Sequence, residues 1–533
     1  MRIKILPLII FLWAGSVLAQ DKPNILLIVA DDMGYGDIGA FGSEIKTPNI
    51  DFLADEGRLF TRFHTAPVCA ATRSMLLSGN NNHVAGVGRQ RAAGPVLENL
   101  PGYEGYLSDR VELLPRLLRD AGYHTYAAGK WHLGDTAAHS PKAAGFERSY
   151  MLLGGAANHF RKGSSRSDTS LYREDDDLVD YPEGRYSTDL YTDRLIEFIE
   201  SGLDDDLPFF AYAAYTSPHW PLQVPDDYLD KYHGVYDEGY DVLRVRRFET
   251  LQAIGIISKS ARLPLRNDSV EPWVELTSVE RQIEARKMEL YAAMVENLDF
   301  HIGRLIATLK MHGVYDETLI VFISDNGPDG GDTINNDTPQ GRYLRSRYDN
   351  SYENMGKVGS WVSYGAPWAE AGSAPFSGWK NFTREGGISA MMVAAGVGVA
   401  SSGAIDATYL TVMDLAPTFL ELGGAVYPND GSVVPMLGES MVEFLAGAES
   451  QVHDENYVTT LYHSGKAFLR QGQWKIVTLN PPFDESKFQL FDLEADPGET
   501  VNLAFRYPER MDAMLALWRV KRLEFGIVLP EDL

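Results

Sequence analysis

The only cysteine of the 533-residue chain heads a segment that is typical of the first turn of a helix. Cys69 is followed four residues later by Arg73, and the helical pattern continues to Gly79. A single thiol forms no intramolecular disulfide, so packing or chemistry must explain its position. A reactive group at a helix N-terminus, with a guanidinium one turn along, suits an anion. We therefore interpret Cys69 and Arg73 as parts of a reactive site.

Two apolar segments of strand length end in residues that offer only oxygen ligands. Residues 24–30 precede the first pair and residues 318–323 precede the second, and the four residues are Asp31, Asp32, Asp325 and Asn326. Carboxylate and amide oxygens suit Ca²⁺ or Mg²⁺ better than Zn²⁺. Alone, the first pair is more typical of a solvated turn or helix cap. The second pair, at another strand end, makes a metal site the better interpretation.

Cationic and proton-transferring side chains follow two further strands and one later turn. Residues 125–128 and 209–215 have strand character, a glycine pair at 386–387 marks the turn, and the side chains are Lys130, His132, His219 and Lys380. Lys130 and His132 are two residues apart, so in an extended segment they share one face. A single histidine after a strand is more often structural than catalytic. The combination with the oxygen ligands favours a common catalytic site.

The elements that must position these residues alternate between strands and helices, including a long helix at about 279–311. This alternation predicts an α/β fold with a large mixed, mostly parallel sheet flanked by helices. In an open α/β sheet, ligands bind outside the carboxyl ends of the strands. Four strands that end in complementary ionisable groups therefore predict a single site at that edge.

The pattern changes after about residue 425. Four strand-like segments predict a small antiparallel sheet, and a helix follows at about 508–524 with one apolar stripe; the stripe residues are Met511, Leu515, Trp518 and Leu523. We expect a signal peptide at 1–19, a catalytic domain at 20–425 and a smaller α+β domain at 426–533. The second domain is expected to be mainly structural, with some residues at the rim of the site.

Three long polar segments are candidates for the border of the site. Residues 326–379 are rich in glycine, aspartate, asparagine and aromatic residues, and residues 160–186 and 225–275 are polar and irregular. Loops of this length are often functional. The alternative for the first segment is a packed surface excursion with aromatic anchors, and the sequence favours neither interpretation.

The N-terminal residues predict export. Arg2 and Lys4 precede an apolar run and a Val17-Leu18-Ala19 segment, the order of a secretory signal peptide. We expect a periplasmic or secreted protein without a membrane anchor. Without residues 1–19 the chain has 46 Lys and Arg (48 minus 2) against 74 Asp and Glu, a balance of −28. This charge argues against nucleic acid and anionic membranes as partners.

Several motifs together resemble the sulfatases, a family with an alkaline-phosphatase-like fold. Cys69-Ala70-Ala71-Thr72-Arg73 resembles the family's Cys-x-Pro/Ala-x-Arg signature, and residues 129–134 (GKWHLG) resemble its second signature. Asp31-Asp32 and Asp325-Asn326 resemble its two metal motifs, and residues 489–493 (QLFDL) resemble its C-terminal hallmark. Residues 82–86 and 154–159 are similar to the bacterial arylsulfatase branch. The match runs from Lys22 to about Leu503.

The resemblance implies hydrolysis of sulfate esters, of aryl sulfates or sulfated carbohydrates, and a role for each residue. Cys69 would be oxidised to formylglycine by a maturation enzyme, on a chain that has not yet folded. One Ca²⁺, preferred over Mg²⁺, would be held by Asp31, Asp32, Cys69, Asp325 and Asn326. Arg73 and Lys130 would steady the nucleophile, and Lys130, His219 and Lys380 would hold sulfate oxygens. His219 and Lys380 would protonate the departing oxygen, and His132 would act as the base that releases sulfate.

Two other functions are kept as alternatives. The first is a phosphonate monoesterase or phosphodiesterase of the same superfamily, which can use a similar nucleophile. The second is a carbohydrate-binding relative without catalytic activity. The leaving-group rates with sulfate and phosphate esters distinguish the first, and the chemical state of Cys69 distinguishes the second.

Overall fold

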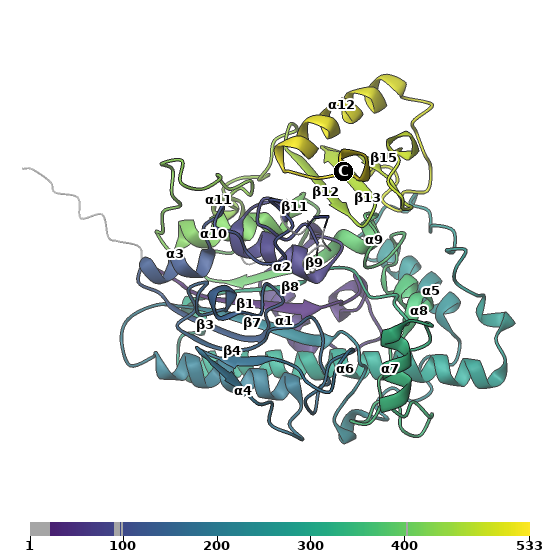
Figure 1. Ribbon diagram of the computed structural model, residues 1–533, viewed down its shortest axis with the longest axis horizontal. Coiled ribbons are helices and arrows are strands. Elements are labelled where there is room, and N and C mark those ends of the chain that lie inside the picture. The colour runs from purple at the N-terminus through teal and green to yellow at the C-terminus, as the bar shows by residue number, and fades with distance from the viewer. Residues whose placement is uncertain (1–21, 90–95, 98–99, 401–402) are drawn as a thin grey trace, which may run out of the picture.

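The computed structural model describes residues 22–89, 96–97, 100–400 and 403–533. The expected signal peptide at 1–19 lies outside the described residues. Figure 1 shows a large central sheet between two layers of helices and a smaller part at the C-terminal end of the chain. Across the described residues, helices that combine the length and the apolar character needed to cross a membrane are absent.

In the described residues, the main sheet has eleven strands in the order β10-β2-β9-β8-β1-β7-β3-β4-β5-β6, with β11 beside β2. Strands β1, β7, β8, β3 and β4 pair in parallel, and β9 is antiparallel to β8 and β2. The predicted mixed, mostly parallel sheet is confirmed. The strands are β1 (Asn24–Asp31), β2 (Arg58–His64), β3 (His124–Lys130), β4 (Arg148–Leu152), β5 (Tyr172–Glu174), β6 (Asp177–Val179), β7 (Phe209–Pro218), β8 (Thr318–Ser324), β9 (Ser389–Gly396), β10 (Ala404–Asp406) and β11 (Leu410–Thr411).

Helices cover both faces of this sheet (Figure 1). Alternate residues of β1 divide between two cores: Leu26 and Ile28 pack on the side of α1, α4 and α6, while Ile25 and Leu27 pack on the side of α2, α3 and α10. The helices are α1 (Pro48–Glu56), α2 (Cys69–Ser78), α3 (Leu114–Asp120), α4 (Ser187–Ser201), α5 (Tyr240–Ala253), α6 (Ser278–Met311), α7 (Pro339–Arg347), α8 (Gly365–Gly372), α9 (Glu385–Ile388), α10 (Leu415–Leu422), α11 (Val442–Leu445) and α12 (Pro508–Glu524).

Local signals in the sequence fix the ends of the elements that matter for the site. Helix α2 begins at Cys69 and ends at Gly79, whose φ of 65° suits a glycine C-cap. Helix α6 begins after Thr277, which forms a capping box with Glu280. Strand β3 ends at Gly129 and Lys130, and a side chain at Gly129 would overlap the carbonyl of Ala214 in β7. Only glycine therefore permits this approach of β3 to β7 beside Lys130.

The predicted antiparallel sheet is also present, as β12 (Val458–His463), β13 (Lys466–Gln471), β14 (Trp474–Val477) and β15 (Gln489–Asp492). Its apolar residues join the same core as the face of the main sheet covered by α2 and α10. Helix α12 has the expected bounds, but the predicted stripe is partly wrong. Trp518 is buried as expected, but Leu523 is 69% exposed. Met514, which was not part of the predicted stripe, is buried instead, because the helix contacts the sheet through a narrow face.

The segment at 326–379 is not one continuous loop, because it contains α7 and α8. Its aromatic residues act largely as anchors, since Trp361 and Trp368 are fully buried and Tyr364 stacks on Tyr291. Both interpretations hold in part: the aromatic anchors pack the segment, while Asp329, Gly331, Thr333 and Gln340 line the cavity described below. The segment at 225–275 contains α5 and packs at a distance from the site described below.

His453 lies between two carboxylates, next to α10. Its Nε2 is 2.8 Å from Oδ2 of Asp414, its Nδ1 is 3.1 Å from Oε2 of Glu439, and its ring stacks on Tyr457. Burial disfavours the imidazolium, but the hydrogen bond to Asp414 and the two carboxylates outweigh it and raise the pKa of His453. A raised pKa stabilises the folded state below about pH 6.5, and this contribution is lost as the pH rises through the folded-state pKa.

We therefore expect His453→Gln to lower the free energy of unfolding more at pH 6 than at pH 9 in urea denaturation. Tyr457 and Tyr409 face the same ring, but burial raises the pKa of both phenols, that of Tyr409 to about 12, so they do not titrate between these values. His233→Gln is the control, because that side chain is 70% exposed and should show no comparable difference. An equal loss for His453→Gln at both pH values would contradict the assignment.

Candidate active site

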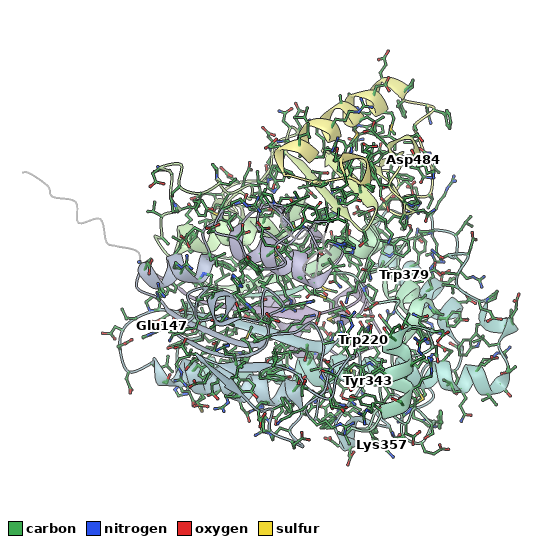
Figure 2. All side chains as sticks on the ribbon, in the orientation of Figure 1. Glu147, Trp220, Tyr343, Lys357, Trp379 and Asp484 are labelled. Atoms are coloured by element: carbon green, nitrogen blue, oxygen red, sulfur yellow. The ribbon has the colours of Figure 1, made fainter. Side chains whose placement is uncertain are left out.

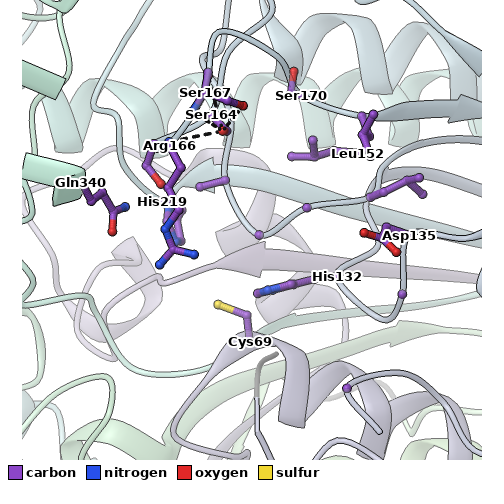
Figure 3. A pocket seen from close by; sticks show the side chains of 18 of the residues that line it. Cys69, His132, Asp135, Leu152, Ser164, Arg166, Ser167, Ser170, His219 and Gln340 are labelled. Carbon is purple, nitrogen blue, oxygen red and sulfur yellow. Dashed lines mark hydrogen bonds between the residues drawn. The ribbon is translucent and has the colours of Figure 1, made fainter. Parts of the chain in front are cut away.

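A cavity of about 950 Å³ opens at the carboxyl ends of the central strands. Figure 3 shows Cys69 at its floor with His132 beside it, and Arg166 and His219 on the opposite side. Of the ten predicted site residues, those that line the cavity are Cys69, His132, His219 and Lys380. The segment at 160–186 borders the cavity as expected, through Ser164 to Leu171. The C-terminal sheet contributes none of the described lining residues, contrary to our expectation for the rim.

Cys69 stands at the N-terminus of α2, as the sequence predicts, and only 1% of it is exposed. Its Sγ donates a hydrogen bond to Oδ1 of Asp32 over 3.6 Å. Burial and the nearby carboxylates of Asp31 and Asp325 hold the pKa of the thiol well above its ordinary value. A raised pKa disfavours the thiolate that cysteine nucleophiles require.

The four oxygen-bearing residues come together beside Cys69. Strands β1 and β8 are adjacent, with Ala30 paired to Ser324, so the residues that follow them meet at one edge. The backbone N–H of Asp32 donates to Oδ1 of Asp325 over 3.2 Å, and Nδ2 of Asn326 donates to Oδ1 of Asp32 over 2.6 Å. Ligand atoms of Asp31, Asp32, Cys69 and His219 lie within 4.8 Å of one another. His219 thus lies close to the predicted metal ligands, although the sequence analysis did not include it among them. The predicted ligands are Asp31, Asp32, Cys69, Asp325 and Asn326.

Arg73 and Lys130 lie beneath the cavity and are completely buried. The guanidinium of Arg73 is 2.9 Å from Oδ2 of Asp325 and also donates to the carbonyl of Lys130 over 2.9 Å. Nζ of Lys130 is 2.7 Å from Oδ2 of Asp31. Burial disfavours both charges in this pair, but the partner charges outweigh it: the pKa of Lys130 is raised and that of Asp31 is held far below its usual range.

Lys380 contacts two further carboxylates from the cavity side. Its Nζ is 2.7 Å from Oδ2 of Asp32 and 3.2 Å from Oδ2 of Asp329. Burial disfavours its charge, yet the two carboxylates hold its pKa well above the ordinary value, so Nζ stays protonated. Burial, with the charges of Asp31 and Asp329 beside it, raises the pKa of Asp32 to about 8 despite Lys380. Asp32 thus remains short of positive charge in the described residues.

His219 follows β7 and has one ring nitrogen fixed. Its Nδ1 donates to the carbonyl of Trp220 over 2.6 Å, which leaves Nε2 as the atom that faces Oδ2 of Asp32, 3.3 Å away. Burial and the charge of Lys380 lower the pKa of His219 to about 3. Proton exchange at this residue therefore takes place at Nε2.

His132 lines the other side of the cavity, but the segment that carries it is not simply extended. Its φ of 59° lies in the left-handed region, so Lys130 turns under the sheet edge while His132 turns into the cavity. The expectation that these two side chains share one face is therefore wrong. Burial and the charge of Lys130 hold the pKa of His132 well below its ordinary value, so the imidazole is neutral. Its Nδ1 is buried without a hydrogen-bond partner among the described residues.

Two groups at the site were not predicted from the sequence. Asp329 contacts Lys380 and accepts a hydrogen bond from Nε1 of Trp220 over 2.8 Å, so it fixes both side chains. Gly155 adjoins His132, where a Cβ would come within 2.5 Å of the imidazole. The sequence shows the glycine pair at 154–155 and Asp329, three residues after Asn326. It does not show their contacts, because these depend on the conformations of the loops. Figure 2 labels Trp220, whose indole contacts Asp329, on the same side of the molecule as Trp379.

A buried group of carboxylates and cations at the strand ends, with a cysteine at a helix start, is the arrangement of an enzyme that acts on anionic esters. The family model of the sulfatases matches residues 23–425. The chain therefore belongs to the sulfatase family, and it is a sulfuric ester hydrolase. This family assignment confirms the resemblance of the sequence motifs.

Similar proteins cover nearly the whole chain. An uncharacterized sulfatase of Schizosaccharomyces pombe is 39% identical over 533 residues, 96% of this chain and 95% of that protein. An arylsulfatase of Klebsiella aerogenes is 38% identical over 437 residues, 79% of this chain and 92% of that protein. The crystal structure of Ps i-CgsB in complex with k-i-k-neocarrahexaose has a TM-score of 0.66 and 25% identity, over 93% of this chain and 92% of that chain.

The neighbouring glycines at 154 and 155 allow a matched test of the placement of His132. Neither glycine lies in the left-handed region, and a methyl group at Gly154 would meet no atom within 4 Å. We expect Gly155→Ala to displace the imidazole and to lower kcat/KM at least about tenfold, with little change in Tm. Gly154→Ala should leave kcat/KM within about twofold of the wild type.

A double-mutant cycle identifies the cause of the loss. Because Gly155 is expected to act through His132, Gly155→Ala combined with His132→Ala should be no less active than His132→Ala alone. Additive losses, or equal losses in the two glycine variants, would show that Gly155 does not position His132.

Proposed function

We propose that this enzyme hydrolyses sulfate esters of aryl or saccharide alcohols through a formylglycine formed from Cys69, with one bound Ca²⁺. The observation that carries the proposal is the placement of Cys69: a buried side chain at the start of α2 that lines a large cavity among three carboxylates and three cations. A neutral thiol in this position is a poor nucleophile, so the site favours a different reactive group at residue 69.

The donor set fits a hard divalent cation. Oδ1 of Asn326 is buried and has no hydrogen-bond partner among the described residues, so one amide oxygen is free to act as a ligand. Carboxylate oxygens of Asp31, Asp32 and Asp325 are buried beside this amide. We assign Asp31, Asp32, Asp325 and Asn326 as the residues that would hold Ca²⁺, beside residue 69. His219, although close, is better suited to contact the ester.

When present, the formylglycine supplies a hydrated aldehyde as the nucleophile, and Ca²⁺ supplies positive charge that stabilises the sulfate oxygens. Arg73 and Lys130 hold the carboxylates in place from below, as their ion pairs with Asp325 and Asp31 indicate. Because neither lines the cavity, we propose that their charges act on the sulfate group mainly from beneath the floor.

Lys380 and His219 are the groups placed to serve the ester oxygens. Nζ of Lys380 stays protonated between Asp32 and Asp329 and can donate a hydrogen bond to the departing oxygen. Nε2 of His219 lies beside the same carboxylate and can exchange a proton there, because Trp220 holds Nδ1. We propose that Lys380 supplies the proton to the leaving group. His219 can assist only after Nε2 has itself taken up a proton, because the neutral ring carries its single proton on Nδ1.

His132 is suited to the opposite task. Its imidazole is neutral and lines the cavity beside Cys69, so it can accept a proton. We propose that His132 is the base that acts when sulfate is released.

We further propose that residues 1–19 direct export to the periplasm or the exterior, and that a maturation enzyme converts Cys69 before the chain folds. Only 1% of Cys69 is exposed, which supports modification of an unfolded chain. Residues 20–425 would form the catalytic domain and 426–533 a supporting domain. The buried ion pairs of Lys475 in β14 with Glu385 and Glu499 support a structural role for the second domain.

We expect Cys69→Ala to lower the hydrolysis of 4-nitrophenyl sulfate to below about one hundredth of the wild-type rate, with an unchanged Tm. Mass spectrometry of the active wild-type enzyme should find the aldehyde in the peptide that contains residue 69. The wild type should hydrolyse sulfate esters faster than the matching phosphate esters. An unmodified thiol in active enzyme would refute the nucleophile, and faster phosphate hydrolysis would favour the phosphonate monoesterase or phosphodiesterase alternative.

Removal of divalent metal should abolish activity, and Ca²⁺ should restore it more effectively than Zn²⁺, because the proposed ligands are all oxygens. Asn326→Ala should raise the Ca²⁺ concentration needed for half-maximal recovery at least about tenfold. Asp329→Asn is the control, since Asp329 lines the cavity but lies outside the proposed ligands, and it should bind one Ca²⁺ per chain. Full activity in protein shown to be metal-free by elemental analysis would refute the metal site.

A further inference from the structure

The cavity holds one cation that the chemistry described above does not use. Arg166 lines the cavity within the segment 160–186, and Figure 3 shows its side chain extending from that segment toward His219 and Cys69. We infer that Arg166 binds a second anionic group of the substrate, so that the preferred substrate is a sulfated saccharide that also carries a carboxylate or another sulfate. This inference rests on the proposed hydrolysis of sulfate esters.

The turn that carries Arg166 is well defined. Oγ of Ser164 accepts hydrogen bonds from the backbone N–H groups of Arg166 and Ser167 over 3.3 and 3.2 Å, and the N–H of Ser164 donates to the carbonyl of Ser167 over 2.9 Å. The carbonyl of Gly163 accepts a bond from Asn158, which ties the turn to the cavity wall. The turn therefore presents the guanidinium from a fixed backbone.

Of the two lysine and arginine side chains that line the cavity, only Arg166 has no carboxylate partner among the described residues. Lys380 is held by Asp32 and Asp329, and Glu104 pairs with Arg110. Asp168, two residues from Arg166, is engaged instead by Arg347 and Tyr343. The five N–H donors of Arg166 thus remain available to a ligand in a protein whose net charge is −26.

A guanidinium with free donors recognises planar or tetrahedral anions through paired, charge-assisted hydrogen bonds. The ester sulfate is already served by Lys380, His219 and the floor of the cavity, so Arg166 must meet a different part of the substrate. The cavity volume of about 950 Å³ is at the upper end of the range for small-ligand sites, which leaves room for a sugar beyond the sulfate.

The remaining lining near Arg166 suits a saccharide rather than an aromatic alcohol. Ser167, Thr169 and Ser170 follow it along the same wall, and Gln340 and Asn381 add amide groups. Hydroxyl and amide side chains pair with sugar hydroxyls, and the rings of Tyr106 and Trp220 offer apolar faces at the sides. An anionic sugar would pair its charged group with Arg166 and its hydroxyl groups with these polar side chains.

The test is competition against hydrolysis of 4-nitrophenyl sulfate by the mature enzyme. Each pair of competitors differs by one anionic group: N-acetylglucosamine 6-sulfate against N-sulfoglucosamine 6-sulfate for a second sulfate, and a 6-sulfated chondroitin disaccharide against its carboxyl-reduced form for a carboxylate. We expect the wild type to bind the more anionic member of at least one pair about 10- to 100-fold more tightly.

In Arg166→Ala that ratio should fall to about twofold or less, while kcat/KM for 4-nitrophenyl sulfate stays within about threefold. Lys162→Ala is the control, because Lys162 is in the same segment but pairs with Asp180 and does not line the cavity. It should retain the wild-type ratio. A wild type that binds both members of every pair equally, or an Arg166→Ala variant with the wild-type ratio, would overturn the inference but leave the proposed function intact. Absence of sulfate release from every ester would instead refute the proposed function, and the inference with it.

Discussion

The structure of the site depends on a charge balance that is completely removed from water. Asp31, Asp32 and Asp325 are buried at the strand ends, and three cations from separate parts of the chain lie against them. Such a group is stable only while every charge keeps its partner, because an isolated charge in this environment is very costly. The sheet, α2 and the loop that carries Lys380 must therefore be held in fixed relative positions.

The architecture provides this rigidity in layers. Parallel pairing of β1 with β7 and β8 fixes the positions at which their polar residues emerge. The helix that begins at Cys69 is wholly buried and brings Arg73 under the same edge. The loop with Lys380 leads directly into α9, and Glu385 in α9 is paired with Lys475 of the C-terminal sheet and with His64. The smaller sheet thus stabilises the site without lining the cavity.

The site separates groups that stay fixed from groups that exchange protons. Arg73, Lys130 and Lys380 are charged because carboxylates outweigh the cost of burial. His132 and His219 are neutral because burial and the neighbouring cations disfavour the imidazolium. This division matches the roles that we propose for these residues, in which the charged groups hold the ester and the histidines exchange protons. Arg166 lies outside this balance and lines the cavity above it.

The sequence by itself determined the family and the fold class, and it predicted that the candidate site residues meet at one edge of the sheet. Strand and helix periodicity, together with the caps at Thr277 and Gly79, depends on interactions close in the chain, so the bounds of α2, α6 and α12 were predictable. The motifs around Cys69 and Asp325 placed the reactive groups at strand and helix ends. The expectation that these groups meet at one edge of the sheet came from the rule that ligands bind at the carboxyl ends of the strands in open α/β sheets.

Only the tertiary structure decided which of these residues line the cavity. The left-handed conformation of His132 separates it from Lys130, and the ion pairs of Lys130 and Arg73 hold both beneath the floor. Contacts such as Asp329 with Lys380 and Gly155 with His132 join segments distant in the chain. Their geometry depends on loop conformation and on mutual charge compensation. Neither leaves a periodic signal in the sequence, because both arise only when the loops pack against one another.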